Sequence, residues 1–205
     1  QNEVENLDPL TALPLAVLTC GANRFISIGK LVQNPPETFV FDSDSLSTEE
    51  LQWMCKRWDS DFRYARHAAN VRLLIASRMK DVKTLRSVAT RCEENGHDYL
   101  LIPRFMTWEA ARQHCEELGG HLPVIRSEAE NLFVNRMFPG GCWFWMGLSR
   151  DEAGTFHWVN GEPFGYHAFA GGFKRDLPGP KIFTCGSWTH DILPNAANPF
   201  MIEWS

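Results

Sequence analysis

The chain has 205 residues, 44% of them hydrophobic and 22% charged, and its formal net charge is −5. This length fits one domain or two small ones, and the composition is that of an ordinary globular protein. The longest apolar run, residues 12–18, is interrupted by Pro14 and is far shorter than the roughly 20 residues a bilayer-spanning helix needs. No basic residue precedes it, so it does not resemble a signal peptide. Because the chain begins at Gln1, we expect an excised piece of a longer protein.

Basic residues are concentrated in the middle of the chain. Residues 56–92 carry 10 basic and 3 acidic side chains, a formal charge of +7, whereas residues 1–55 and 93–205 each carry −6. One interpretation is a set of amphipathic helices with a solvated basic face. The other is a surface for nucleic acid or another anionic partner, formed by basic helices within residues 56–91.

Residues 1–95 form an N-terminal region of unknown type in which short strands precede helices. Apolar stretches between turn residues predict strands at 15–18, 25–28 and 39–41. Ser47 and Glu50 fit a capping box that opens a helix. The apolar spacing over 48–94 predicts two or three helices with breaks near 59–61 and 80–81. Asn95-Gly96 is a typical helix stop, and we place the domain boundary there.

The C-terminal half, residues 97–205, alternates strands and helices. Strands are predicted at 99–102, 121–125, 144–148, 155–159 and 200–204, and helices at 108–118 and 127–133. Ser127 and Glu130 fit a second capping box, and Gly147 marks a position where backbone approaches too closely for a side chain. The stretch 166–184 is rich in Gly and Pro and predicts a long irregular loop of the kind that often carries function.

An ordered set of motifs then becomes informative. W-x-x-A-x-x-x-C and L-G-G-H-L are followed by S-E-A-E-N, W-M-G-L, G-x-F-x-W-V-x-G-E-P, G-S-W and P-F-M-I-E-W. This set resembles the C-type lectin-like domain over residues 97–205. The resemblance implies an α+β fold with two helices, small antiparallel sheets and a long loop, serving as a non-catalytic binding module. It is closest to the bacterial type, whose members are often appended to larger signalling proteins such as serine/threonine kinases or to surface proteins. A related set comprises the variable ligand-binding proteins of diversity-generating retroelements.

The cysteines depart from the family pattern. The resemblance implies that Cys115 would bridge to the last strand, but Ile202 stands near that place, and no cysteine follows Cys185 to complete the second bridge. We therefore expect both usual disulfides to be absent. Six unpaired thiols favour a reducing, cytoplasmic location, with the cell surface or extracellular space as the alternative.

The calcium motifs depart as well. Sugar-binding members use Glu-Pro-Asn in the long loop and Trp-Asn-Asp after it, whereas this chain has Glu162-Pro163-Phe164 and Trp188-Thr189-His190-Asp191. Calcium prefers six to eight oxygen ligands. The weak candidates are Glu162, Asp176 and Asp191, and we expect binding without calcium or another cofactor.

Aromatic and cationic residues dominate the region of the long loop and form the predicted ligand site: Phe164, Tyr166, His167, Phe169, Phe173, Lys174, Arg175, Trp188 and His190. Such side chains stack on sugars and dominate protein-binding surfaces. About half of these rings are expected to pack in the core instead.

No local frame for catalysis is present: the chain lacks G-x-S-x-G and H-E-x-x-H. The favoured hypothesis is a calcium-independent module that binds a protein or glycan through the long-loop face. The alternatives are a calcium-dependent carbohydrate-binding lectin and an anionic-partner module that uses residues 56–91.

Overall fold

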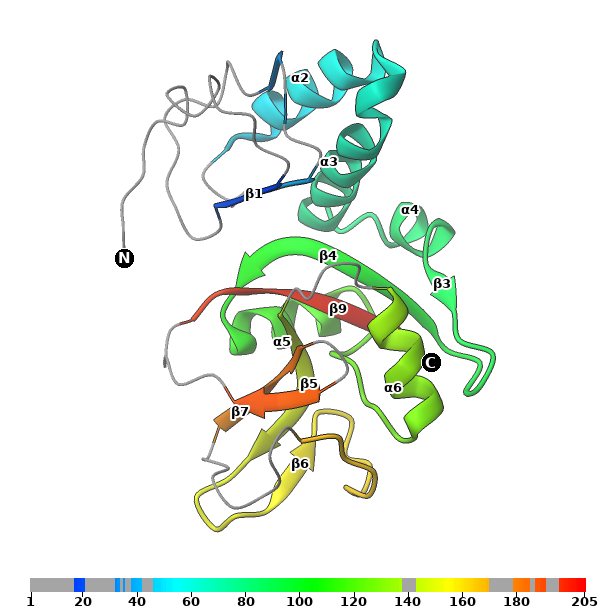
Figure 1. Cartoon of the computed structure of the whole chain (residues 1–205), viewed down its shortest axis with the longest axis vertical. Coiled ribbons are helices and arrows are strands. Elements are labelled where there is room, and N and C mark those ends of the chain that lie inside the picture. Colours follow the sequence, from blue (N-terminus) through cyan, green and yellow to red (C-terminus); the bar gives the residue numbers. More distant parts are fainter. Residues whose placement is uncertain are drawn as a thin grey trace. The chain divides into compact units, whose positions relative to one another are not determined.

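The computed structural model describes residues 17–20, 32–33, 35, 38–41, 46–137, 143–169, 179–184, 187–190 and 196–205. The chain divides into two compact units (Figure 1). The first comprises Gln1–Asp81 with Pro103–Phe105, and the second comprises Val82–Ile102 with Met106–Ser205. Among the helices so described, none is long and apolar enough to cross a lipid bilayer.

The first unit combines a strand pair with a helical pair. Strand β1 (Val17–Cys20) runs parallel to β2 (Thr38–Phe41), so the prediction at 39–41 is confirmed. The prediction at 15–18 is confirmed for residues 17–18, and residues 15–16 lie outside the described residues. The predicted strand at 25–28 lies outside the described residues. Helices α2 (Thr48–Asp59) and α3 (Ala65–Arg78) are joined by the short 3₁₀ helix η3 (Phe62–Tyr64).

The capping box at the start of α2 is confirmed. The Glu50 N–H donates to Ser47 Oγ at 3.1 Å, and the Ser47 N–H donates to Glu50 Oε2 at 2.6 Å. The apolar face that follows is buried between the two helices, with Leu51, Met54 and Trp58 at most 1% exposed. The capping box thus satisfies two backbone N–H groups at the start of α2.

The middle segment contains three α-helices with breaks where they were predicted, but the last helix ends early. Helix α4 (Val82–Ser87) is followed by strand β3 (Thr90–Arg91), which pairs antiparallel with β4 (Asp98–Met106). The expectation of helix up to residue 94 is therefore wrong. Gly96, with φ of 72°, serves as the turn of a hairpin instead of a helix stop, because residues 90–91 pair with residues 98–99. The β3–β4 hairpin spans the domain boundary predicted at Asn95-Gly96. The division into domains at residues 1–95 and 97–205 stays a prediction.

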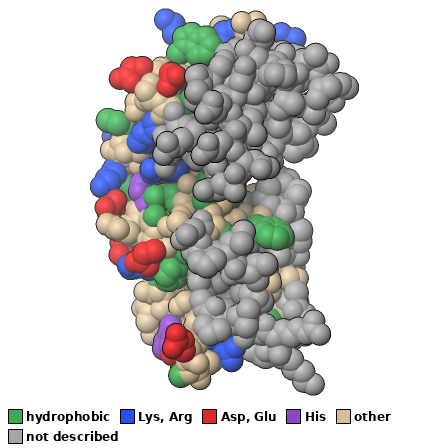
Figure 2. All heavy atoms as spheres, turned by 90° about the vertical axis from the view of Figure 1, so that its left-hand side faces the viewer, with side chains coloured by type: hydrophobic (Ala, Val, Ile, Leu, Met, Phe, Trp, Pro, Cys, Tyr) green, Lys and Arg blue, Asp and Glu red, His purple; other side chains and the backbone are tan. Residues whose placement is uncertain are grey.

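Several basic residues of this segment are bound within the chain. Arg72 pairs with Asp59, Arg78 donates to the Leu46 carbonyl at 2.7 Å, and Arg86 and Arg91 both reach Asp98. Acidic and basic side chains are interspersed over the face shown in Figure 2. Part of the +7 charge of residues 56–92 is therefore neutralised by partners within the chain.

The second unit is built on a mixed sheet. Its described strands have the order β3-β4-β9-β5-β7-β8, with β6 paired to β5. The remaining bounds are β5 (Phe144–Arg150), β6 (Phe156–Trp158), β7 (Gly179–Thr184), β8 (Ser187–His190) and β9 (Asn198–Trp204). Helices α5 (Trp108–Glu117) and α6 (Glu128–Arg136) lie beside this sheet, which is the predicted α+β arrangement (Figure 1).

Two predictions need correction, a strand at 121–125 and a loop at 166–184. Residues 121–125 were expected to form a strand, but they form only one bridge, between His121 and Glu203. Pro123 has no N–H to donate, and the Val124 N–H donates to the Glu203 carboxylate instead of to a neighbouring strand. The loop expected at 166–184 is wrong for its last part, because residues Gly179–Thr184 form β7. Pro180 lies near the beginning of that strand, where proline is tolerated.

Tryptophan side chains fix the helices onto the sheet. The indole N–H of Trp108 donates to the Met146 carbonyl at 2.8 Å, and that of Trp204 donates to the Leu118 carbonyl at 3.1 Å. Trp204 is 2% exposed, and burying a ring of this size contributes about 2–3 kcal/mol. Both indole N–H groups therefore have a hydrogen-bond acceptor, which removes the cost of placing these polar atoms away from water.

The cysteines whose side chains are described are Cys55, Cys92 and Cys115, all of them buried free thiols. Cys115 Sγ lies 3.9 Å from the Met201 carbonyl, so α5 faces the last strand as the resemblance implies. Burial raises the pKa of the Cys115 thiol, and the nearby Glu116 charge adds to this. The thiol therefore stays neutral and unreactive. Cys185 lies outside the described residues, so the absence of the second disulfide stays a prediction.

Candidate ligand-binding site

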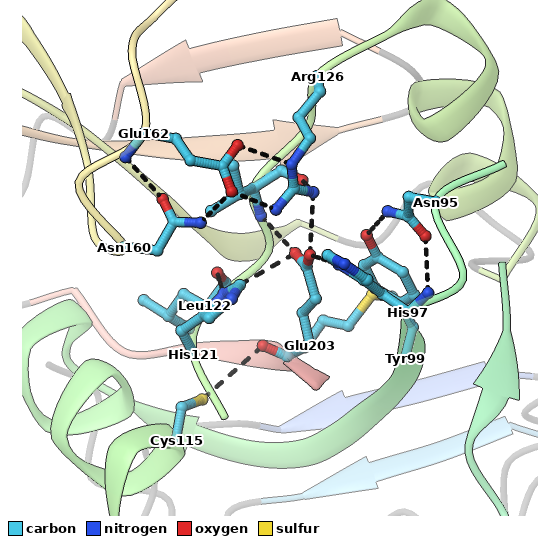
Figure 3. A network of polar contacts seen from close by, with 12 residues as sticks. Asn95, His97, Tyr99, Cys115, His121, Leu122, Arg126, Asn160, Glu162 and Glu203 are labelled. Carbon is cyan, nitrogen blue, oxygen red and sulfur yellow. Dashed lines mark hydrogen bonds and ion pairs between the residues drawn. The ribbon is translucent and has the colours of Figure 1, made fainter. Parts of the chain in front are cut away.

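A buried carboxylate on β9 organises the polar side of the second unit. The Glu203 side chain is fully buried, with its Oε1 2.6 Å from His97 Nδ1 and 2.9 Å from Arg126 Nη1. Its Oε2 accepts the Val124 N–H at 2.7 Å (Figure 3). A buried charge is tolerated only when it is paired and hydrogen-bonded, and this one has three partners from two segments of the chain.

Arg126 is the hub of this network. It donates from Nε and Nη2 to both oxygens of Glu162, each at 2.8 Å, while its Nη1 reaches Glu203 and the Val124 carbonyl (Figure 3). Burial disfavours the charged form of Arg126, but its hydrogen bonds and the charges of Glu162 and Glu203 outweigh this and raise its pKa. The planar guanidinium thus binds two carboxylates at once, one in the turn after β6 and one on β9.

The second predicted capping box is half correct. Ser127 Oγ accepts the Glu130 N–H at 3.2 Å, as expected for an N-cap. The Glu130 carboxylate, however, accepts the N–H of Arg126 at 2.5 Å and the side chain of Asn95 at 2.9 Å. Glu130 therefore positions the backbone of Arg126 instead of closing a box on the helix cap.

Glu162 was a weak candidate for a calcium ligand. It lies in the turn that ends β6, where the Asn160 side chain accepts its N–H at 3.1 Å and donates to its Oε1 at 2.6 Å. Both carboxylate oxygens are bound to Arg126, and an Arg beside a carboxylate repels a divalent cation. Asp176 and Asp191 lie outside the described residues. Within the part of the chain that is described, no group of three His, Cys, Asp or Glu side chains could hold a metal ion.

The Arg126 pair gives Glu162 a measurable pH signature. The hydrogen bonds from Arg126 hold the pKa of Glu162 below its ordinary value of 4.5. A lowered carboxyl pKa stabilises the fold above the unfolded-state pKa and loses that contribution as the pH falls below it. Because the side chain is 39% exposed, we expect Glu162→Gln to cost only about 1 kcal/mol at neutral pH.

Urea unfolding between about pH 7 and pH 3 tests this expectation, since stability should fall less steeply in Glu162→Gln than in the wild type. Glu152→Gln, at an exposed carboxylate of the β5–β6 turn, is the matched control and should follow the wild type. Parallel curves for Glu162→Gln and the wild type would contradict the pairing.

An aromatic ladder lies beside the polar network. We use this name for the rings of Phe156, Phe164, His167 and Phe169. Phe156 and Phe164 stack with centroids 4.5 Å apart, Phe164 and His167 are 6.3 Å apart at 15°, and His167 and Phe169 are 5.9 Å apart at 29°. The Arg150 guanidinium lies 5.4 Å from the Phe156 ring centre. The phenylalanines are half-buried against the core and His167 is exposed, so the ladder presents ring surface to solvent on a rigid base.

The predicted ligand residues divide into three groups: those at or beside the ladder, one that lies in the core beneath it, and those that lie outside the described residues. Phe164, His167 and Phe169 belong to the ladder, and half-buried Tyr166 packs edge-on against Trp188. Trp188 is fully buried and donates its indole N–H to Asn131 at 2.9 Å, so it supports the site from the core. The remaining candidates cannot be placed, because the side chain of His190 and all of Phe173, Lys174 and Arg175 lie outside the described residues.

Two contributors were missed in the sequence. From the sequence, Phe156 was assigned only to a strand. It stands two positions before Trp158, and residues two apart in a strand share one face, so both rings lie on the same face of β6. Arg126 carried no local signal, because its partners are 36 and 77 residues away along the chain.

Comparisons with known proteins agree with this geometry. Residues 104–181 match the family model of the lectin C-type domain. The human C-type lectin domain family 10 member A is 38% identical over 74 residues, which cover 36% of this chain and 21% of that protein. The mouse C-type lectin domain family 6 member A is 31% identical over 92 residues, 44% of each chain. The type-2 ice-structuring protein of Hemitripterus americanus is 34% identical over 64 residues, 31% of this chain and 39% of that protein. The chain thus spans less than half the length of these curated relatives.

Solved structures support the same fold. The mouse scavenger receptor C-type lectin carbohydrate-recognition domain aligns with a TM-score of 0.51 and 21% identity, covering 57% of this chain and 95% of that domain. A calcium-independent type II antifreeze protein also gives a TM-score of 0.51, at 23% identity and with 57% and 91% coverage. The predicted C-type lectin fold is confirmed. The C-terminal half of the chain, which includes residues 104–181, therefore contains a C-type lectin domain, and such domains are non-catalytic binding modules.

Proposed function

We propose that the lectin half binds a glycan or protein ligand without calcium, through the aromatic ladder and the long loop that follows it. The ladder is the observation that carries this proposal. Three half-buried phenylalanine rings and one exposed imidazole form a cluster of mutual ring contacts against a packed core, in which Phe169 also lies 5.3 Å from Phe156 and 6.5 Å from Phe164. Rigid, partly exposed rings bind the apolar face of a sugar or an apolar side chain at low entropic cost.

Calcium independence is supported by the Arg126–Glu162 pair. Glu162 is the carboxylate of the only Glu-Pro sequence near the loop, and both its oxygens are already engaged by a cation. The same fold also occurs in an antifreeze protein described as calcium-independent. A calcium-dependent lectin would need ligands from elsewhere in the chain.

Two finer predictions belong to this proposal. The first is a bacterial type of domain without the usual disulfides, which the free thiol of Cys115 supports. The second is attachment to a larger signalling or surface protein, or a role as a retroelement-diversified variable protein, and both stay predictions.

Substitution in the ladder tests the proposed site. On a panel of immobilised mono- and oligosaccharides, we expect Phe164→Ala to weaken binding of any retained sugar about tenfold, because a stacked aromatic contact contributes roughly 1–1.5 kcal/mol. His167→Ala, at the exposed ring, should weaken it several-fold. His157→Ala is the matched control, because this exposed imidazole lies on the face of β6 opposite Phe156.

The outcome separates the two ligand classes. Loss of sugar binding in the ladder variants alone supports a glycan site. Sugar binding that survives both ladder substitutions would contradict the proposed site. A wild-type chain that retains no sugar on the panel would remove the glycan part of the proposal.

A further inference from the structure

The helical end of the first unit carries exposed aromatic and cationic side chains that the lectin site does not use. Phe62 is 90% exposed and Trp53 is 52% exposed, unusual values for rings of this size. Both belong to a cluster that we call the basic tip, which consists of Trp53, Lys56, Arg57, Phe62, Arg63 and Arg66.

Five of these residues lie around the turn that joins α2 and α3, and Trp53 lies one helical turn before Arg57 on α2. Trp53, Lys56 and Arg57 lie on one exposed face of α2, because they are three and four positions apart. Phe62 and Arg63 lie in η3, directly beyond the end of α2. Arg66 is exposed in the first turn of α3, so the tip is the turn that joins the two helices (Figure 1).

Acidic side chains at this end are neutralised within the chain. Asp61 pairs with Arg63 at 2.5 Å, and Asp59 pairs with Arg72. Glu49 and Glu50 lie in the first turn of α2, at its other end, and Glu50 is bound in the capping box. The net charge of the tip is therefore positive.

We propose that the basic tip binds reversibly to the surface of a bilayer that contains anionic phospholipid. A ring that projects from a helix–helix turn can enter the interfacial layer, where aromatic side chains are favoured, while the surrounding Lys and Arg side chains contact lipid phosphates. Each cation near an anionic bilayer adds to the attraction. The charge complementarity and the projecting ring together specify this partner.

A nucleic-acid surface, considered from the sequence, fits less well. Proteins that bind single strands stack bases on rings along a basic groove. Phe62 has 90% of its surface free of protein contact, so there is little beside it to hold a stacked base. Arg78, Arg86 and Arg91, which would have extended such a groove, are bound within the chain.

Vesicle co-sedimentation of the full chain tests the proposal. The probes are phosphatidylcholine vesicles with and without about 30 mol% phosphatidylserine, at low and at physiological salt. We expect binding only to the anionic vesicles, weakened by salt. Phe62→Ser should lower the partition coefficient about fivefold, because the inserted ring is lost. Lys56→Glu/Arg66→Glu should lower it more than tenfold, because two attractive charges become repulsive.

Matched controls come from exposed positions of the second unit. Val88→Ser removes an apolar side chain that is 53% exposed, and Lys83→Glu reverses an exposed charge of α4. Both should bind vesicles like the wild type. Far-ultraviolet circular dichroism checks that every variant is folded, since none of these side chains is buried.

Three results would overturn the proposal. They are equal binding to neutral and anionic vesicles, wild-type binding by the tip variants, or no vesicle binding together with salt-sensitive binding of a single-stranded oligonucleotide that the tip variants lose. The last result would assign the tip to nucleic acid.

Discussion

An Arg126→Met chain is expected to be about 3–5 kcal/mol less stable than the wild type, the usual cost of removing one partner of a buried ion pair. Glu203 is fully buried, and without Arg126 it retains His97, the Val124 N–H and, at 3.9 Å, the His121 ring. The remaining carboxylate must either stay charged in a low-dielectric site or take up a proton, and both cost free energy. Urea unfolding followed by near-ultraviolet circular dichroism measures the loss.

The matched control is Arg112→Met on α5. Arg112 also pairs with two carboxylates, Glu109 and Glu116, but these are 67% and 49% exposed. Water replaces the lost contacts there, so we expect a cost of at most about 1 kcal/mol. The double variant Arg126→Met/Glu203→Gln should regain part of the lost stability, because a neutral amide replaces the uncompensated charge. Equal effects of Arg126→Met and Arg112→Met would contradict the role given to the network.

The second large effect is expected at Gly147 in the middle of β5. A Cβ atom there would lie 2.7 Å from Val159 Cγ2 and 2.8 Å from the Leu122 carbonyl oxygen. Backbone hydrogen bonds at 2.8 Å hold Gly147 to Pro123 and to Val159, so neither neighbour can move away freely. Gly147→Ala should cost about 3 kcal/mol, the upper range for overpacking a well-filled core.

Gly165→Ala provides the comparison. No heavy atom lies within 4 Å of a Cβ built at Gly165. Its replacement should leave stability unchanged or raise it slightly, because alanine restricts the unfolded chain. Thermal unfolding of both variants measures the contrast, and a Gly147→Ala chain as stable as Gly165→Ala would show that the close approach has been misjudged.

Local patterns predicted the fold well where the structure depends on local interactions. The Ser47–Glu50 box, the helix at 108–118 and the close approach at Gly147 are each confirmed, because helix caps, helical periodicity and a missing Cβ act within a few residues. The errors arose where a distant partner decided the outcome. Residues 121–125 are not a strand because the Glu203 side chain takes the Val124 N–H.

The candidate site shows the same division. The aromatic residues around the loop could be identified by type, and three of them belong to the ladder. Their burial could not be predicted, since Trp188 is buried by packing against rings from other segments. The Arg126–Glu162 contact joins residues 36 positions apart and leaves no periodic signal, so the sequence offered Glu162 only as a metal candidate.

We propose that this C-type lectin domain binds its ligand without calcium, and a calcium titration of the wild-type chain can show whether it does. Thermal unfolding and the sugar panel are measured in about 1 mM EDTA and in about 5 mM CaCl₂, a concentration that saturates calcium sites of extracellular modules. We predict the same melting temperature and the same retained sugars in both. A saturable rise in stability of about 1–2 kcal/mol, with sugar binding that appears only in calcium, would contradict the account.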